Sequence, residues 1–538
     1  MSESGPVDRV VFGPVAAVRP WLFAKALYVL LALDVWHTLV GPAWRYGAAG
    51  FNVAHFAILD ALPMPTREAY IGMLVLVGAM GFTAAALPRT PRALSIAIAV
   101  LYTWGWSCSM LDSYQHHYLI TVLLVATCFF PRLTAVDLFG RGAPIPVATA
   151  KASKKKGTPP GVTLFPDGLV ARIRSLGWTL VTSFAGVVYS FTAVSKWEPE
   201  WRSGAALRDI THGGASMQAP MDFAGELGLD ADTVFAILGS GMIVVQVVCA
   251  IGYLTASLRD GAPSEAETKA LEAQWAAMVA ERTRITIAAA VSIMIALGVG
   301  VSFSWIGALV VMALGITIGM PRVFHRFAFA PLGRPRVLSI VASLALLLAL
   351  SFHVGAEYIG LQIGWFSYYM IVLALVALVP AHWLAALAAV VTQPVRSADE
   401  SVFDRVPLMA PVLGLVAAGA AAYAGVEIDL PGAYTTSIAV GLVALALGVG
   451  AMMRPALRPT LARAAAGLGV GMIVCGISMT RGTERYDFYR FAGGDFRRRH
   501  EYRQALEAYV EANRYAPPGE SREDRVHEME DAIRNGTP

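Results

Sequence analysis

Long apolar segments recur along the whole chain, and they restrict the folds that it can adopt. Of its 538 residues, 56% are hydrophobic and only 15% are charged, whereas soluble domains carry roughly 25% charged residues. Apolar segments of about 18 or more residues are typical of membrane-spanning helices. We therefore predict an all-α fold, that of a polytopic helical integral membrane protein in contact with the lipid bilayer.

About thirteen segments are expected to span the membrane. They cover approximately 20–40, 70–87, 93–111, 117–131, 177–196, 233–257, 285–302, 304–320, 337–355, 361–380, 408–425, 434–452 and 462–480. The apolar segment 382–393 is too short to span and is expected to be re-entrant or interfacial.

The distribution of lysine and arginine predicts the orientation, because cytoplasmic loops are enriched in both. With the N-terminus in the cytoplasm, the inside loops 132–174, 321–336 and 453–463 contain many basic residues, and the outside loop 198–232 contains fewer. This orientation places Lys196 at the outer face of the cell membrane. With thirteen spans, the C-terminal tail lies outside as well.

After Thr480 the composition becomes charged and aromatic. Residues 487–517 match the spacing of one tetratricopeptide (TPR) unit, and 519–534 is expected to form a third amphipathic helix that caps it. One repeat cannot bury its own apolar face, so the TPR-like tail 487–534 is expected to dock on the membrane domain or on a protein partner. The alternative is an amphipathic helical tail without a partner.

Lys196 ends an apolar segment and is followed by Trp197 and Trp201. Removal from water disfavours the ammonium form, lowers the pKa of a lysine and can convert it into a base. The alternative is a lysine that reaches to the water interface within an ordinary aromatic belt. A carboxylate close to Lys196 would favour its protonated form and weaken the interpretation as a base.

A second polar cluster, 112–118, contains His116 and His117 and follows two tryptophans. A histidine titrates near neutral pH and can act as a general acid or base. An interfacial belt of histidine and tyrosine explains the same residues equally well. Adjacent histidines point to different faces of a helix and are poorly placed to bind one metal ion together.

Other polar residues in the expected spans form pairs on one helix face. They are Asp34 with His37, and His353 with Glu357. Each pair is either a structural hydrogen bond or part of the lining of a substrate cavity. Two ligands from one helix are too few for zinc, and the cysteines form no Cys-x-x-Cys motif, so no metal site is expected. The chain contains no phosphate-binding glycine loop and no nucleic-acid-binding module, so no nucleic-acid partner is expected.

Three stretches resemble the horizontally transferred transmembrane (HTTM) domain, the membrane module of vitamin K-dependent γ-glutamyl carboxylase and its bacterial relatives. The first is Asp112 to Leu119, followed by an apolar run to Pro131. The second is Ala193 to Trp201, which resembles the family's Gly-x-x-Lys-Leu-x-x-Asp-Trp motif, and the third is His353 to Met370. The resemblance extends over 19–395, with additional spans at 408–480 and the tail at 487–534. Trp197 stands where the motif has leucine, and Ser195 replaces a second lysine found in some members.

The resemblance implies a function as well as a fold. It assigns Lys196 as the base toward a reduced quinone that resembles vitamin K hydroquinone, whose reaction with oxygen is coupled to carboxylation. It also assigns His116 to stabilise the carbanion or the carboxylated product. The carboxylase has a large β-rich domain after its membrane part, where this chain has additional spans and the tail. The resemblance therefore supports a quinol-dependent carboxylase-like lyase more than it supports carboxylation of a peptide.

A second interpretation is a non-catalytic membrane scaffold that recruits a partner through its tail. The enzyme predicts that Lys196 and His116 converge on an apolar cavity of quinone size. The scaffold predicts a lysine that is open to water and paired with Glu198 or Glu200. A transporter is the third interpretation. Transport of ions would require several intramembrane carboxylates or inverted repeats, and the sequence shows no obvious repeat.

Overall fold

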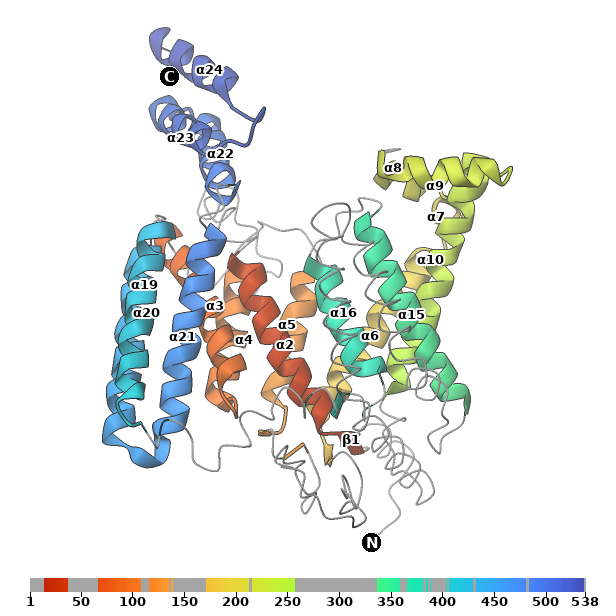
Figure 1. The fold of residues 1–538 in the computed structure, drawn as a ribbon. Helices are drawn as coiled ribbons and strands as arrows, with labels where there is room; N and C mark the ends of the chain where they lie inside the picture. The colour runs from red at the N-terminus through yellow and green to blue at the C-terminus, as the bar shows by residue number, and fades with distance from the viewer. Residues whose placement is uncertain are drawn as a thin grey trace, which may run out of the picture. The chain divides into compact units, whose positions relative to one another are not determined.

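Apolar helices dominate the computed structural model of the chain (Figure 1). The structure describes residues 14–36, 66–107, 116–134, 171–211, 215–256, 336–358, 365–379, 406–428, 432–479 and 483–536, with a few single positions between these ranges. Within them, the only strands are one antiparallel pair, β1 (Pro14–Ala16) and β2 (Arg172–Arg174). The prediction of an all-α fold is therefore confirmed.

Six helices of the described ranges are long and apolar enough to cross a membrane. They are α3 (Arg67–Ala86), α6 (Leu176–Ser195), α10 (Ala231–Leu254), α19 (Met409–Ile428), α20 (Ala433–Met453) and α21 (Arg458–Met479). Shorter apolar segments lie in α4 (Arg92–Ser107), α5 (His116–Cys128), α15 (Arg336–Tyr358) and α16 (Trp365–Leu378). The expected spans 285–302 and 304–320 lie outside the described residues, so the count of about thirteen stays a prediction.

The chain divides into two compact units. Unit 1 consists of Met1–Phe23 and Ala135–Gln393, and unit 2 of Ala24–Thr134 and Pro394–Pro538. The domain boundaries expected from the sequence rest on resemblance and composition rather than on packing, and they stay a prediction.

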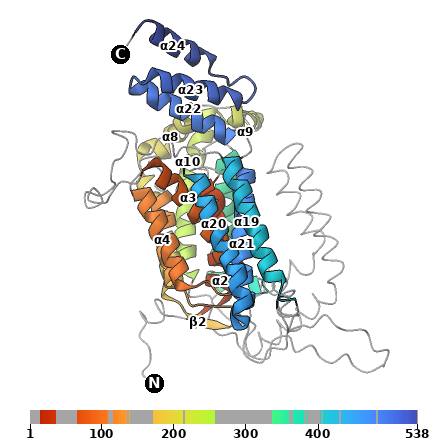
Figure 2. The ribbon, with the colours of Figure 1, turned by 90° about the vertical axis from the view of Figure 1, so that its left-hand side faces the viewer.

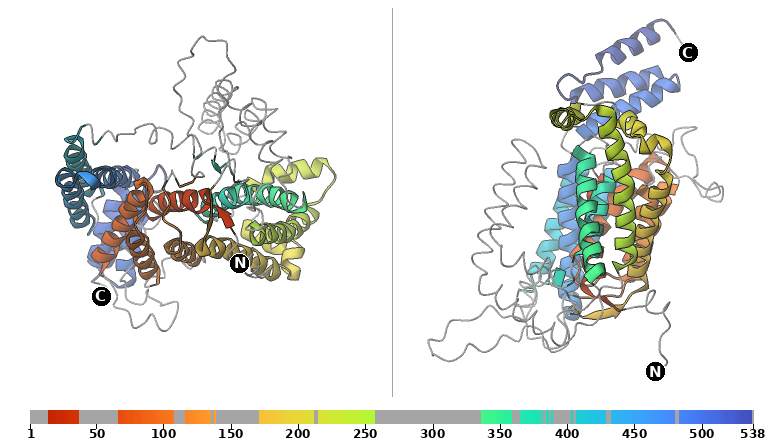
Figure 3. Two further views of the ribbon diagram at one scale, coloured as in Figure 1. Left: turned by 90° about the horizontal axis from the view of Figure 1, so that it is seen from below. Right: turned by 90° about the vertical axis from the view of Figure 1, so that its right-hand side faces the viewer.

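In unit 1, α10 packs against both α6 and α15, and α15 packs on α16 (Figure 3). Three short helices connect α6 to α10: α7 (Pro199–Arg202), α8 (Ala205–Thr211) and α9 (Ala215–Glu226). All three contact α10. The connection that follows Lys196 is therefore supported by a membrane helix.

Two glycines permit this contact between the connection and α10. A Cβ atom on Gly239 of α10 would lie 2.0 Å from the carbonyl oxygen of Trp201. Gly204 has a φ of +80°, a conformation that L side chains rarely adopt, and its α-carbon lies against Gly239. The hydroxyl of Ser240 adds a hydrogen bond to the carbonyl oxygen of Arg202 at 3.3 Å. Main chain thus packs directly on main chain beside the lysine-bearing segment.

Unit 2 contains α19, α20 and α21 side by side, and α21 also packs on α3 (Figure 2). Small residues allow the backbones to approach closely. A Cβ atom on Gly414 would lie 2.9 Å from the carbonyl oxygen of Ala444 and 3.0 Å from the α-carbon of Gly448. Such small-residue contacts are typical of helix packing in membranes, where apolar burial against lipid gives little driving force.

Two basic side chains of α2 (Val18–Asp34) bind the carbonyl ends of other helices. In unit 1, Arg19 donates to the carbonyl oxygen of Val379 at 2.9 Å, just beyond α16. In unit 2, Lys25 donates to the carbonyl oxygen of Ala84 at 2.8 Å, in the last turn of α3. The last carbonyls of a helix have no intrahelical partner and carry partial negative charge. These contacts explain how an apolar helix accommodates two cations.

The tail forms three helices: α22 (Thr483–Arg498), α23 (Tyr502–Arg514) and α24 (Glu523–Arg534). Ala505, Tyr509 and Met529 are its buried core. A helical tail was expected from the sequence, and its assignment as a TPR-like unit stays a prediction.

The contact between α10 and the connection predicts opposite effects at two nearby glycines. We expect Gly239→Ala to lower the free energy of unfolding by about 1–3 kcal/mol, because the new methyl group overlaps main chain. Gly241→Ala is the control, since nothing lies within 4 Å of its Cβ position, and the better helix propensity of alanine predicts a change of about 1 kcal/mol or less in the stabilising direction. Thermal unfolding in detergent would measure both, and equal effects would contradict the packing.

Candidate functional site

Lys196 is the C-cap of α6, so it lies where the apolar helix meets its connection. Its main-chain N–H donates to the carbonyl oxygen of Thr192 at 3.2 Å. Glu198 then adopts an extended conformation and Pro199 begins α7, because the residue before a proline is disfavoured in the helical region. The sequence therefore ends α6 at this lysine and turns the chain toward α10.

The amine of Lys196 is half-buried and lies beside an aromatic ring. Its Nζ atom is 4.8 Å from the centroid of the Trp201 ring. The side chains of Glu198 and Glu200 are exposed, and no carboxylate of the described ranges forms an ion pair with this lysine. Burial lowers the pKa of Lys196 below the ordinary lysine value of about 10.4, while the ring face favours the ammonium form and offsets part of this shift. The lysine therefore differs from one that is paired with a glutamate, and its role as a base stays a prediction.

A buried cluster of polar side chains lies in the same unit as Lys196. We call it the Tyr–His cluster and define it as Tyr189 of α6, Tyr253 of α10 and His353 of α15. The hydroxyl of Tyr189 is 2.8 Å from Nε2 of His353. The rings of Tyr189 and Tyr253 stack with their centroids 5.5 Å apart. Three helices distant in sequence therefore meet at one buried hydrogen bond.

Several buried polar atoms of unit 1 have no hydrogen-bond partner among the described residues. They include Nδ1 of His353, the hydroxyl of Tyr253, the hydroxyl of Ser367 on α16, and Oε1 of Gln246 on α10. The ring of Phe366, next to Ser367, lies 5.8 Å from the ring of His353. An unsatisfied buried polar group costs about 1–3 kcal/mol, so each of these groups carries a cost that a bound polar molecule would reduce.

The Tyr–His cluster and Lys196 share a face of α6. Tyr189 precedes Lys196 by seven residues, which is close to two helical turns and about 10 Å along the axis. Gln246 and Tyr253 have the same spacing on α10. The packed faces of α6 and α10 thus run from the half-buried amine to the unpartnered polar atoms.

The other residues expected to carry chemistry, two histidines and an Asp–His pair, are not shown to approach Lys196. His117 is buried, and its Nδ1 lies 2.7 Å from the hydroxyl of Tyr102, so it serves a structural contact in unit 2. His116 begins α5 in the same unit, but its side chain lies outside the described ones, and its convergence with Lys196 stays a prediction. Asp34 is buried, and its expected partner His37 lies outside the described residues.

His353 pairs with Tyr189 of another helix. The side chain of its expected partner Glu357 lies outside the described ones, so that pair stays a prediction. The sequence alone did not indicate a role for Tyr189, Tyr253, Gln246 or Ser367. The position of Tyr189, seven residues before the lysine inside an apolar segment, could have indicated that it shares a helix face with Lys196. Pairing across helices was not readable from the sequence.

Among the side chains that the structure describes, no group of three or more His, Cys, Asp or Glu residues could hold a metal ion. No protein family, no curated protein and no solved structure matches the chain.

The Tyr–His cluster predicts that its two tyrosines differ in their contribution to stability. We expect Tyr189→Phe to lower the free energy of unfolding by about 1–3 kcal/mol, because it leaves Nε2 of His353 buried without a partner. The matched variant Tyr253→Phe removes a hydroxyl that has no partner, so it should be neutral or stabilising. Thermal unfolding in detergent distinguishes the two, and a larger loss for Tyr253→Phe would contradict the hydrogen bonding described above.

Proposed function

We propose that the chain is a polytopic membrane enzyme of the HTTM type, in which the neutral amine of Lys196 accepts a proton from a bound substrate. The observation that carries the proposal is the half-buried amine, which has no carboxylate partner among the described residues and a lowered pKa. A base must be unprotonated to act, and a pKa closer to neutrality increases the unprotonated fraction at physiological pH.

We further propose thirteen spans, with the N-terminus in the cytoplasm and both Lys196 and the tail outside. The loop charges support this topology through the positive-inside rule. The apolar helices of the described ranges support a membrane protein. Lys196 then lies at the outer interface, where a lipid-soluble reactant and a water-soluble acceptor can meet.

A reduced quinone is the cofactor that the Tyr–His cluster, in the same unit as Lys196, would suit. Such a molecule is a flat apolar ring with two hydroxyl groups, and the Tyr–His cluster offers stacked aromatic rings together with unpartnered polar atoms. Nδ1 of His353 and the hydroxyls of Tyr253 and Ser367 are available to hydrogen-bond such groups. When bound, a reduced quinone would supply, by reaction with oxygen, the strong base that carboxylation of a carbon acid requires.

The chain's own residues then have separate tasks. Lys196 accepts a proton from a hydroxyl group, since its amine is half-buried whereas the carboxylates of Glu198 and Glu200 are exposed. The ring of Trp201 lies beside the amine and contributes to its partial burial. The packing of α10 at Gly239 fixes the connection on which Trp201 lies.

Turnover of a reduced quinone tests the proposal. Purified protein in lipid nanodiscs would receive a reduced quinone, bicarbonate and oxygen, and quinone epoxide would be measured by chromatography. We expect Lys196→Ala to lower turnover by about 100-fold or more, the usual contribution of a general base. Lys196→Arg should be equally inactive, because an arginine keeps the charge but does not lose its proton.

The control is Arg208→Ala, which removes an exposed cation of α8 that pairs with Asp232 at the start of α10. It should leave turnover within about twofold, because exposed ion pairs contribute little. Equal turnover by wild type and Lys196→Ala would contradict the assignment of the base. Absence of turnover of any quinol by folded wild-type protein would favour the non-catalytic scaffold.

A further inference from the structure

The tail carries a compact group of arginines and tyrosines at the end that follows the membrane helix. We call it the arginine–tyrosine cluster; its members are Arg485, Tyr486, Tyr489, Arg490, Tyr515 and Arg522. The Arg485 guanidinium lies 5.3 Å from the centroid of the Tyr515 ring, and that of Arg490 lies 5.3 Å from the Tyr486 ring. Nε of Arg522 donates to the Tyr486 hydroxyl at 3.1 Å, and the rings of Tyr489 and Tyr515 stack.

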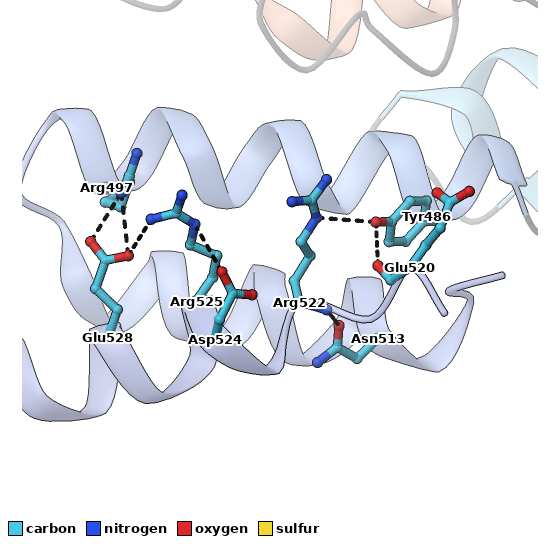
Figure 4. Close-up of polar contacts among 8 residues, drawn as sticks. All are labelled: Tyr486, Arg497, Asn513, Glu520, Arg522, Asp524, Arg525 and Glu528. Carbon is cyan, nitrogen blue, oxygen red and sulfur yellow. Dashed lines mark hydrogen bonds and ion pairs between the residues drawn. The ribbon is translucent and has the colours of Figure 1, made fainter. Parts of the chain in front are cut away.

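The arginines at the two ends of the tail contact different kinds of group (Figure 4). At the far end, Arg497 and Arg525 both bind the carboxylate of Glu528. At the near end, Arg485 and Arg522 contact tyrosines, and neither forms an ion pair with a carboxylate of the described residues. Their positive charge is therefore not neutralised by the described part of the tail.

The contacts with tyrosine also orient these guanidinium groups. The Tyr515 ring lies against the guanidinium of Arg485, and a hydrogen bond from Nε of Arg522 to the Tyr486 hydroxyl orients the second group. Both contacts leave other N–H groups for another acceptor. Paired N–H groups of this kind match the oxygens of a phosphate. The cluster therefore suits an anion with several oxygen atoms better than it suits an apolar partner.

The length of the connection keeps this cluster near the membrane. α21 ends at Met479 and α22 begins at Thr483, so four Cα-to-Cα steps separate them and allow at most about 15 Å. Arg485 follows two residues later. The headgroup layer adds roughly 5–7 Å to each side of the hydrocarbon core, and tyrosines are enriched in this layer.

We propose that the arginine–tyrosine cluster binds the phosphate groups of anionic membrane lipids and holds the C-terminal tail on the bilayer surface. Unneutralised arginines, their orientation by tyrosine rings and the short connection to a membrane helix support this ligand together. The proposal is independent of the role of Lys196.

Hydrogen exchange of the full-length protein in nanodiscs tests the proposal. Phosphatidylcholine nanodiscs would be compared with nanodiscs that also contain phosphatidylglycerol. We expect the anionic lipid to slow amide exchange at the start of α22 and over residues 515–522, and high salt to reverse the effect because it screens surface charge.

Arg485→Gln should weaken the protection by the anionic lipid roughly fivefold. The double variant Arg485→Gln/Arg522→Gln should weaken it roughly 25-fold, because each arginine near the surface contributes about the same binding energy.

Arg534→Gln is the matched control, because it removes an exposed arginine that pairs with Asp531 at the other end of α24, and it should keep the full effect. Exchange around Met529, in the core of the tail, reports whether each variant is folded, and Arg485→Gln alone leaves the contact of Arg522 with Tyr486 in place. Equal exchange in both lipids would overturn the proposal. Protection by free glycerol phosphate, or by an acidic peptide in place of anionic lipid, would also overturn it, since the ligand would then not be the membrane.

Discussion

The packing of α10 against the connection that follows α6 is the contact on which the site depends. Main chain meets main chain at Gly239 and Trp201, which leaves no room for water or for a side chain between them. Trp201 is thereby held where its ring lies beside the amine of Lys196. Burial at this place lowers the pKa of Lys196 below the ordinary value.

Polar groups within the apolar helices fall into two kinds. Some hold helices together, as Lys25 does when it binds the carbonyl end of α3, and as His117 does with Tyr102. Others, such as Nδ1 of His353 and the hydroxyl of Tyr253, are buried and have no partner in the part of the chain that the structure describes. The first kind offsets the cost of burial within the fold. The second kind retains that cost, which a bound molecule could relieve.

The sequence predicted the helices and the end of α6 well, because apolar length and the Pro199 that follows Lys196 act locally. It also placed helices in the tail, since their periodicity is local too. It did not predict the Tyr–His cluster, because Tyr189 and His353 are 164 positions apart and meet only through tertiary packing. For the same reason the arginine–tyrosine cluster, which joins α22 to the segment before α24, was not visible in the repeat pattern.

The protonation of Lys196 is the central claim, and its titration measures it most directly. Carbon-13 labelling of the lysine side chains, with Lys196→Arg to assign the resonance, would follow the carbon next to the amine as the pH is raised. We predict a midpoint below about 10.4, the ordinary lysine value, because burial disfavours the ammonium form. A midpoint at or above that value would show an amine that remains protonated, and it would contradict the role of Lys196 as a base.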